Sequence, residues 1–242
     1  VCLTAYSKNF AEEVDKYSDI TLVGDSLGSV LYNYNSTKKV TLTNMIDHSR
    51  SVRLGVKKSL MVVDMPYDTY SSNNSAFKNA KKILKETKCD AVKLEGGKKI
   101  IPIVKKLVQN KIPVMGHVGI LPQTDKKFTF KGRKQRESER ILNDTKLLEN
   151  AGAFSIVLEC IETKLSKKIT NQIKIPTIGI GSSSNCDGQV LVIDDLIGLT
   201  QSKFKFVKKY IDMSKIIEGA VKKYRVDVLK KRFPKAKHSF KN

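Results

Sequence analysis

The sequence predicts an α/β protein with a single domain over residues 1–242, folded as a closed (β/α)8 TIM-type barrel. The chain of 242 residues, 40% of them hydrophobic, is long enough for one large core. Short apolar runs alternate along it with segments of helical periodicity, which is the pattern of βαβ units around a parallel sheet. About eight such repeats can be counted, and eight is the number that closes a barrel.

The expected strands are short apolar runs bounded by polar or turn-forming residues. A strand that is buried on both faces reads as a nearly continuous apolar run. The run ITLVG at 20–24 shows this clearly, as does SLMVVDM at 59–65, which Pro66 ends. In chain order the predicted strands are 1–5, 20–24, 59–65, 91–94, 112–116, 155–158, 176–181 and 189–193.

The segments between these strands carry apolar residues at helical spacing. In 41–53, for example, Met45, Ile46 and Val52 fall on one face of a helix. Pro102 fits its helix only in the first turn, where no backbone N–H is needed. In chain order the predicted helices are 7–17, 41–53, 75–88, 98–110, 137–151 and 163–172, followed by a helical tail from 204 onward that includes 216–229.

A polar stretch from 123 to 135 interrupts this rhythm. It contains most of the basic run KFTFKGRKQR and shows no apolar periodicity. Long loops in compact domains are often lids over a functional site. We therefore expect a long, mobile loop at 123–135.

The chain is strongly basic, with a net charge of +21 and a pI of about 9.8. Such a charge is compatible with a nucleic-acid partner. Lysine pairs are nevertheless spread along the whole chain, and no aromatic residues are interleaved with them as a stacking platform. We expect a solvated, lysine-rich surface that attracts small anionic substrates, and no nucleic-acid partner.

The cysteines and the hydropathy favour a cytoplasmic protein. Cys2, Cys89, Cys160 and Cys186 lie far apart and form no CxxC pair, so neither a zinc site nor a disulfide framework is indicated. Cys160 could be a nucleophile, but a small buried strand residue is the better interpretation. No apolar run is long enough to span a bilayer, so we expect no membrane association.

Five of the predicted strands end on residues that can do chemistry. A strand that is buried on both faces has no place for charge along its length, so polar residues collect where it leaves the core. In a β/α barrel these ends converge on one mouth, where catalysis occurs. The residues concerned are Asp25 with Ser26, Asp64, Lys93 with Glu95, His117, and Glu159.

The three acidic residues Asp25, Asp64 and Glu95 predict a site for Mg²⁺. Hard divalent cations prefer oxygen ligands, and Mg²⁺ needs only a few carboxylates. Its remaining positions would be open to a substrate with adjacent oxygens, such as a 2-oxo acid. The alternative is that one or two of these residues, Asp25 for example, cap the following helix.

The other polar residues at the strand ends suggest substrate contacts and a base. Lys93 and Glu95 are two residues apart and so point to the same side of their strand. Lys93 must find an anion inside the barrel, either a carboxylate or a substrate oxyanion. His117 is a candidate hydrogen-bond donor to substrate. Glu159 is a candidate general base, with a salt bridge to Lys93 as the alternative.

The glycine-rich stretch GIGSSSNCDGQ at 179–189 has two interpretations. Its backbone N–H groups could bind a phosphate. It could equally form a tight turn between two elements of the barrel, and the motif alone does not decide between them.

Taken together, these stretches resemble the ketopantoate hydroxymethyltransferase (3-methyl-2-oxobutanoate hydroxymethyltransferase) family over essentially the whole chain, in the same order. The most specific segments are LVGDSLG (22–28), AVKLEGG (91–97) and PVMGHVGILPQ (113–123). The other matching segments are MIDHSRSVRLG, VVDMPYDTY, AGAFSIVLE, IPTIGIG and DGQVLV. The family's N-terminal helix has no counterpart in this sequence.

The resemblance implies a (β/α)8 barrel with Mg²⁺ as cofactor. The implied reaction transfers a hydroxymethyl group from 5,10-methylenetetrahydrofolate to 3-methyl-2-oxobutanoate, giving 2-dehydropantoate in pantothenate synthesis through a Mg-stabilised enolate. It assigns Asp25, Asp64 and Glu95 to the metal. It assigns Ser26, Lys93 and His117, with Asp25 and Asp64, to the 2-oxo acid, and Glu159 to the base. It also implies a homo-oligomer, a decamer in the family.

Two other functions remain open from the sequence. A related carbon–carbon lyase or a phosphonopyruvate-type barrel would share Mg²⁺ and 2-oxo acid chemistry but would not use folate. A basic nucleic-acid binder would instead show salt-dependent DNA binding.

Overall fold

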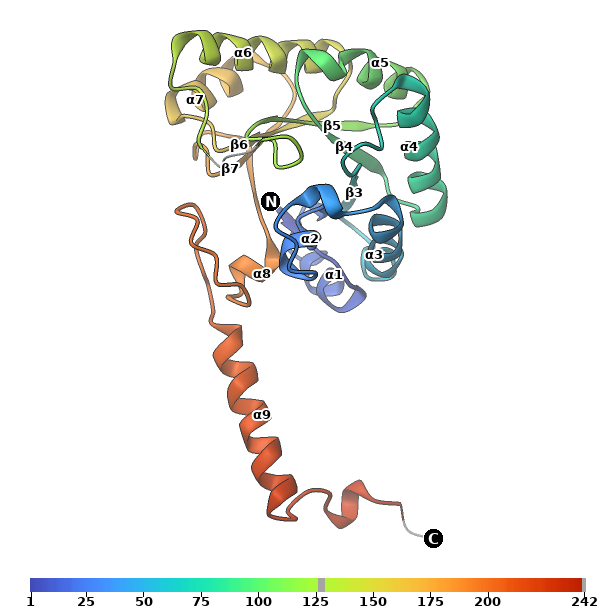
Figure 1. Ribbon diagram of the computed structural model, residues 1–242, viewed down its shortest axis with the longest axis vertical. Coiled ribbons are helices and arrows are strands. Elements are labelled where there is room, and N and C mark those ends of the chain that lie inside the picture. Colours follow the sequence, from blue (N-terminus) through green and yellow to red (C-terminus); the bar gives the residue numbers. More distant parts are fainter. Residues whose placement is uncertain (126–128, 241–242) are drawn as a thin grey trace. The chain divides into compact units, whose positions relative to one another are not determined.

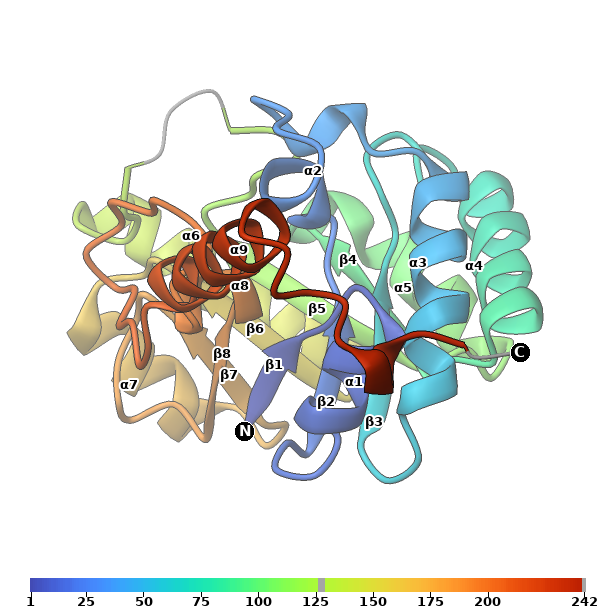
Figure 2. The same cartoon turned by 90° about the horizontal axis from the view of Figure 1, so that it is seen from below.

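In the computed structural model, which describes residues 1–125 and 129–240, eight parallel strands close into a barrel in chain order from β1 to β8. The closure is made by β1, which pairs with both β2 and β8. The predicted (β/α)8 barrel is therefore confirmed (Figures 1 and 2). The strands are β1 Cys2–Thr4, β2 Ile20–Val23, β3 Leu60–Asp64, β4 Ala91–Glu95, β5 Val114–Gly119, β6 Ser155–Glu159, β7 Thr177–Ile180 and β8 Gly188–Leu191.

Helices follow most of the strands. Helices α3 and α4 each start with a capping box, because Thr41 and Ser72 exchange hydrogen bonds with the residues three positions later. The α-helices are α1 Lys8–Val14, α2 Leu27–Val30, α3 Leu42–Gly55, α4 Asn73–Thr87, α5 Ile101–Gln109, α6 Gln135–Asn150, α7 Thr163–Gln172, α8 Ile193–Leu196 and α9 Met213–Leu229. The 3-10 helices are η1 Thr37–Lys39, η2 Lys98–Ile100 and η3 Ala236–His238.

The chain divides into two compact units, which differs from the single domain expected over 1–242. The first unit, Val1–Ile193, contains all eight strands. The second unit, Asp194–Asn242, carries α9, and no side chain of that helix is buried.

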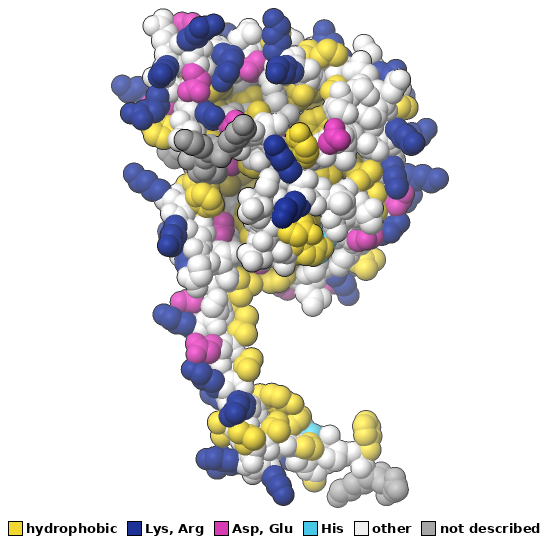
Figure 3. Space-filling model, in the orientation of Figure 1, with side chains coloured by type: hydrophobic (Ala, Val, Ile, Leu, Met, Phe, Trp, Pro, Cys, Tyr) yellow, Lys and Arg dark blue, Asp and Glu magenta, His cyan; other side chains and the backbone are white. Residues whose placement is uncertain are grey.

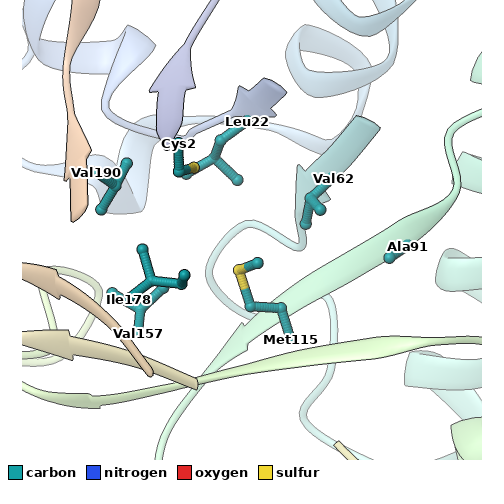
Figure 4. Packing of buried hydrophobic residues seen from close by; sticks show 8 residues of the cluster. All are labelled: Cys2, Leu22, Val62, Ala91, Met115, Val157, Ile178 and Val190. Carbon is teal, nitrogen blue, oxygen red and sulfur yellow. The ribbon is translucent and has the colours of Figure 1, made fainter. Parts of the chain in front are cut away.

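The interior of the barrel is filled by one side chain from each strand (Figure 4). These residues are Cys2, Leu22, Val62, Ala91, Met115, Val157, Ile178 and Val190. All are 6% exposed or less, and they close the interior as a packed core rather than a pore. Because side chains alternate along a strand, this layer fixes which further residues of each strand point inward.

Several predicted elements differ in detail from the structure. The expected helix over 98–110 is divided into η2 and α5, with Pro102 in the first turn of α5. The expected helical tail is helical from Met213, and 204–212 is not. Helices α2 and α8 were not predicted, because four residues are too few to show a periodicity. Part of the lid predicted at 123–135, residues 126–128, lies outside the described residues.

Asp15, directly after α1, anchors the start of β3. Its carboxylate accepts backbone N–H groups from Lys57, Lys58 and Ser59 at 2.7–3.1 Å and the Ser59 hydroxyl at 2.7 Å. Burial raises the pKa of this carboxyl, but the donors from Ser59, Lys57 and Lys58 outweigh it and lower the pKa to about 2. Asp15 thereby satisfies the donors of the loop that leads into the barrel.

Replacing Asp15 with Ala is expected to lower the free energy of unfolding at pH 7 by about 3 kcal/mol, because several donors lose their ionised acceptor. The folded pKa lies below the unfolded value of about 3.9. The stabilisation is therefore fully present above that value and is lost as the pH falls towards 2. Urea unfolding at pH 7 and at pH 2–4 measures both effects. Glu13→Ala, which removes one exposed ion pair, is the control and should cost under about 1 kcal/mol. Equal losses in the two variants would contradict the assignment.

Candidate active site

Most of the charged residues predicted at the strand ends point into the barrel mouth, because each follows an interior core residue by two or four positions. Asp64 follows Val62, and Lys93 and Glu95 follow Ala91 on β4. In the same way, His117 follows Met115 on β5 and Glu159 follows Val157 on β6. The two-residue period of a strand therefore brings these side chains together.

Lys93 forms a buried ion pair with Asp64. The two residues are partners in the β3–β4 register, and Nζ lies 2.9 Å from Oδ1, with both side chains 6% exposed or less. Burial lowers the pKa of Lys93, but the carboxylates of Asp64, Glu95 and Asp25 outweigh it and raise the pKa above its ordinary value. The anion that Lys93 requires is thus a carboxylate of the protein, and the alternative salt bridge between Lys93 and Glu159 is not what the structure shows.

His117 lies between two carboxylates. Its Nδ1 is 3.4 Å from Oε1 of Glu95, its register partner on β4, and its Nε2 is 3.2 Å from Oε2 of Glu159. Burial and Lys93 lower the pKa of His117, but Glu95 and Glu159 prevail and raise it to about 9. The imidazole is therefore a cation at neutral pH and can donate from both nitrogens.

The pKa of Glu95 responds to the same neighbours. Burial raises it, but His117 and Lys93, with the N–H of Gln123, outweigh this and hold it below its ordinary value. Glu95 is therefore ionised. Glu159 is the most accessible of these charged side chains, at 13% exposed, and it ends β6 next to the mouth.

Gly119, in the β5 strand that carries His117, allows the ends of β5 and β6 to approach closely. Its φ is +104°, and a Cβ there would lie 2.1 Å from the carbonyl oxygen of Glu159. The N–H of Ile120 donates to that same oxygen at 2.9 Å. Only glycine fits this position without moving Glu159.

Asp25 and Ser26 lie just beyond β2. The Asp25 N–H donates to Oδ2 of Asp64 at 3.0 Å, and Ser26 Oγ shares a hydrogen bond with the Tyr6 hydroxyl at 2.8 Å. Burial raises the pKa of the Asp25 carboxyl, and Asp64 and Glu95 raise it further. The Asp25 carboxylate accepts from Gln123 and caps no helix, since α2 has no side-chain cap.

Sequence reasoning missed two residues of this site, Gln123 and Tyr70. Gln123 is 1% exposed and donates from Nε2 to Asp25 Oδ2 at 2.8 Å. The Tyr70 hydroxyl donates to Oε1 of Gln123, and it accepts the Glu95 N–H at 3.3 Å. Both residues stand in segments that were noted, GHVGILPQ and VVDMPYDTY, but neither ends a strand or carries charge at neutral pH.

The donor set fits Mg²⁺ through Asp25 and Asp64. The Asp64 carboxylate is 3% exposed, and its Oδ1 contacts Lys93 Nζ in an ion pair whose geometry is not that of a regular hydrogen bond. The mutual repulsion that raises the pKa of Asp25 is what a bound cation would relieve. Mg²⁺ is usually held by one or two carboxylates together with waters and substrate oxygens. Within 1–125 and 129–240, no three His, Cys, Asp or Glu side chains stand ready to hold one ion, so Glu95 as a third direct ligand stays a prediction.

The glycine-rich stretch at 179–189 forms a turn that binds its own neighbours. Ser182 Oγ donates to the Leu158 carbonyl and accepts the Ile161 N–H, at 2.7 and 3.1 Å. Ser183 Oγ accepts the Asn185 N–H at 3.1 Å, and Gly181 has φ +61°. These contacts favour the turn over a phosphate site.

The remaining sequence predictions concern charge, thiols and membranes. Lysine and arginine side chains are scattered over the face shown in Figure 3.

All four cysteines are free and buried. Burial together with Glu159 raises the pKa of Cys160 to about 12, so that thiol is no nucleophile at neutral pH. In the part of the chain that the structure describes, no helix is both long and apolar enough to cross a bilayer.

Solved structures with this fold include enzymes of the PEP mutase/isocitrate lyase superfamily. A phosphonopyruvate hydrolase superposes with a TM-score of 0.64 and 10% identity, over 100% of this chain and 86% of that one. A 2,3-dimethylmalate lyase from that superfamily gives 0.61 and 10%, over 99% and 83%. At such identities the likeness concerns the fold alone.

Sequence relatives are far more similar. The 3-methyl-2-oxobutanoate hydroxymethyltransferase of Pelagibacter ubique (strain HTCC1062) is 61% identical over 240 residues, which cover 99% of this chain and 93% of that protein. The enzyme of the same name from Rhizobium etli is 46% identical over 246 residues, covering 100% and 90%. A family model described as ketopantoate hydroxymethyltransferase matches residues 1–236. The chain therefore belongs to the ketopantoate hydroxymethyltransferase family.

Proposed function

We propose that this protein transfers a hydroxymethyl group from 5,10-methylenetetrahydrofolate to 3-methyl-2-oxobutanoate, giving 2-dehydropantoate for pantothenate and coenzyme A synthesis. The proposal includes Mg²⁺ as the cofactor and an enolate of the 2-oxo acid as the nucleophile. It places the reaction in the cytoplasm, where the four free, buried thiols would stay reduced.

The observation that carries the proposal is the row of charged side chains across the barrel mouth. Lys93 is 2.9 Å from Asp64 and 3.5 Å from His117 Nδ1, and His117 lies between Glu95 at 3.4 Å and Glu159 at 3.2 Å. To lose a proton, a 2-oxo acid needs positive groups near its carboxylate and its keto oxygen. It also needs a base beside C3, the carbon next to the keto group. The mouth offers two cations, Lys93 and His117, and a carboxylate, Glu159, at the end of the row.

Each residue can be given a role in this reaction. Asp25 and Asp64 would hold the Mg²⁺, which when bound supplies Lewis-acid polarisation of the keto group. Lys93 and His117 would donate to the substrate oxygens and stabilise the negative charge that develops there. Glu159 would take the proton from C3, the carbon next to the keto group, and Ser26 would orient the substrate carboxylate.

Substrate binding would also prepare the base. In the structure His117 Nε2 lies 3.2 Å from Oε2 of Glu159, so this carboxylate is already engaged with the imidazole. A substrate oxygen that accepts from Nε2 would replace this contact and leave the carboxylate of Glu159 free to accept the C3 proton.

The runner-up function, a lyase of the phosphonopyruvate type, has the same fold in its favour. The transferase is favoured because relatives with that name are 44–61% identical over nearly the whole chain, whereas the lyases and hydrolases are about 10% identical. On the face shown in Figure 3, lysine and arginine side chains are scattered and form no single basic patch, which favours a small-molecule substrate over nucleic acid.

Replacing Glu159 with Gln is expected to lower the exchange of the C3 proton for deuterium by at least about 100-fold, because an amide cannot take the proton. Binding of the 2-oxo acid in the presence of Mg²⁺ should change little, since the cations and the acidic pair are retained. Proton NMR in D₂O measures the exchange, and calorimetry measures the binding. Glu139→Gln, on the exposed face of α6, is the control. Wild-type exchange in Glu159→Gln would refute the role of this residue.

An assay for 2-dehydropantoate tests the reaction itself. Product should form only when 3-methyl-2-oxobutanoate, methylene-tetrahydrofolate and Mg²⁺ are all present, and chelation of the metal should stop it. Consumption of a 2-oxo acid without folate would instead support the lyase. No turnover under either condition would sink both proposals.

We also propose that the protein assembles with copies of itself. The support comes from α9, whose residues Ile217, Val221, Tyr224 and Val228 lie on one helix face and are each at least 42% exposed. An apolar helix face of this kind normally packs against another protein surface.

Replacing Val221 with Glu is expected to shift the protein to smaller species, because a charge cannot be buried in an apolar contact. Sedimentation velocity at micromolar concentration measures the change. Lys222→Gln alters the charge by the same one unit at a position outside this apolar face and should leave the distribution unchanged. A wild-type protein that sediments only as a monomer would overturn the proposal.

A further inference from the structure

Gln123 is uncharged, yet it donates hydrogen bonds to two candidate site residues, Glu95 and Asp25. It lies in the loop after β5, and its backbone N–H donates to Glu95 Oε2 at 3.1 Å. Its side-chain Nε2 donates to Asp25 Oδ2 at 2.8 Å and to the carbonyl oxygen of Met65 at 3.0 Å. One residue of the loop after β5 therefore contacts groups that follow β2 and β3 and a carboxylate on β4.

The orientation of this amide is fixed by its partners. Nε2 faces a carbonyl and a carboxylate, which can only accept, so the nitrogen must be on that side. Oε1 faces the Tyr70 hydroxyl, which donates to it. All the strong donors and acceptors of the side chain are engaged, and Gln123 is only 1% exposed, so its amide is held in one position.

Among the partners of Gln123, the Asp25 carboxylate is the group whose direction depends on this contact. Asp25 lies beyond the end of β2, outside the regular pleat that orients Asp64, Lys93 and His117. A side chain there is not directed by strand alternation, so something else must set its direction. The amide of Gln123 occupies one carboxylate oxygen, Oδ2, and leaves Oδ1 for a ligand.

We propose that Gln123 is a positioning residue, which directs the Asp25 carboxylate towards the cation and the 2-oxo acid and ties it to Glu95 and Tyr70. The inference rests on the proposed function, because the ligand that Asp25 would meet is the one proposed above. Partners that orient metal ligands in this way typically change metal affinity or activity 10- to 100-fold when they are removed.

The test replaces Gln123 with Met, which keeps the length of the side chain and removes its hydrogen bonds, and with Glu, which puts a second carboxylate against Asp25. Calorimetric binding of 3-methyl-2-oxobutanoate at stepped Mg²⁺ concentrations should show affinity lowered by about 10- to 100-fold in Gln123→Met, and by more in Gln123→Glu. The thermal midpoint without metal, measured in parallel, reports the fold. Gln109→Met, at the exposed end of α5, is the matched control and should bind as the wild type does.

A second variant covers the case in which the Gln123 variants do not fold. Tyr70→Phe removes the hydroxyl that donates to Oε1 and accepts the Glu95 N–H, and its loss should weaken binding about fivefold. A merely structural role would lower the thermal midpoint but leave affinity and C3 proton exchange per folded molecule unchanged, and this result would overturn the inference. If the wild type itself binds no 2-oxo acid with Mg²⁺, the proposed function fails first, and the inference falls with it.

Discussion

The two-residue alternation of side chains along parallel strands is the constraint on which the rest of this structure depends. The barrel closes only when each strand places an apolar residue in the interior, and it does so with one residue from each of the eight strands. That choice decides which later residue of the same strand also points inward. Asp64, Lys93, His117 and Glu159 are each two residues beyond a core residue, and the functional mouth is therefore an extension of the core pattern.

The same constraint makes the mouth an electrostatic network rather than a set of separate groups. Buried charges are costly unless they are paired, and the parallel register puts acid beside base: Asp64 opposite Lys93, and Glu95 opposite His117. The pairing keeps Lys93 and His117 protonated despite their burial, because the carboxylates raise both pKa values. A substrate anion that enters this site meets cations that are already in place, which is the arrangement that electrostatic catalysis requires.

The fold and the charged part of the site could be predicted from the sequence because both depend on local patterns. Apolar runs that end in Asp64 or His117 can be recognised in the sequence itself. The resemblance to a known family, whose motifs occur in the same order, supports the same fold. The contacts of Gln123 could not be predicted in this way. They join loops that are up to 98 positions apart, and an uncharged amide gives no sign of what it binds. The division of the chain at Asp194 was not predicted, since helical periodicity does not show where one compact unit ends and the next begins.

The most direct test of the account is a crystal structure of the protein with Mg²⁺ and 3-methyl-2-oxobutanoate. The account predicts the ion against the carboxylates of Asp25 and Asp64, the 2-oxo acid within hydrogen-bond distance of Lys93 and His117, and Glu159 facing C3. A 2-oxo acid bound outside the barrel mouth, with the mouth residues paired as they are without ligand, would contradict it.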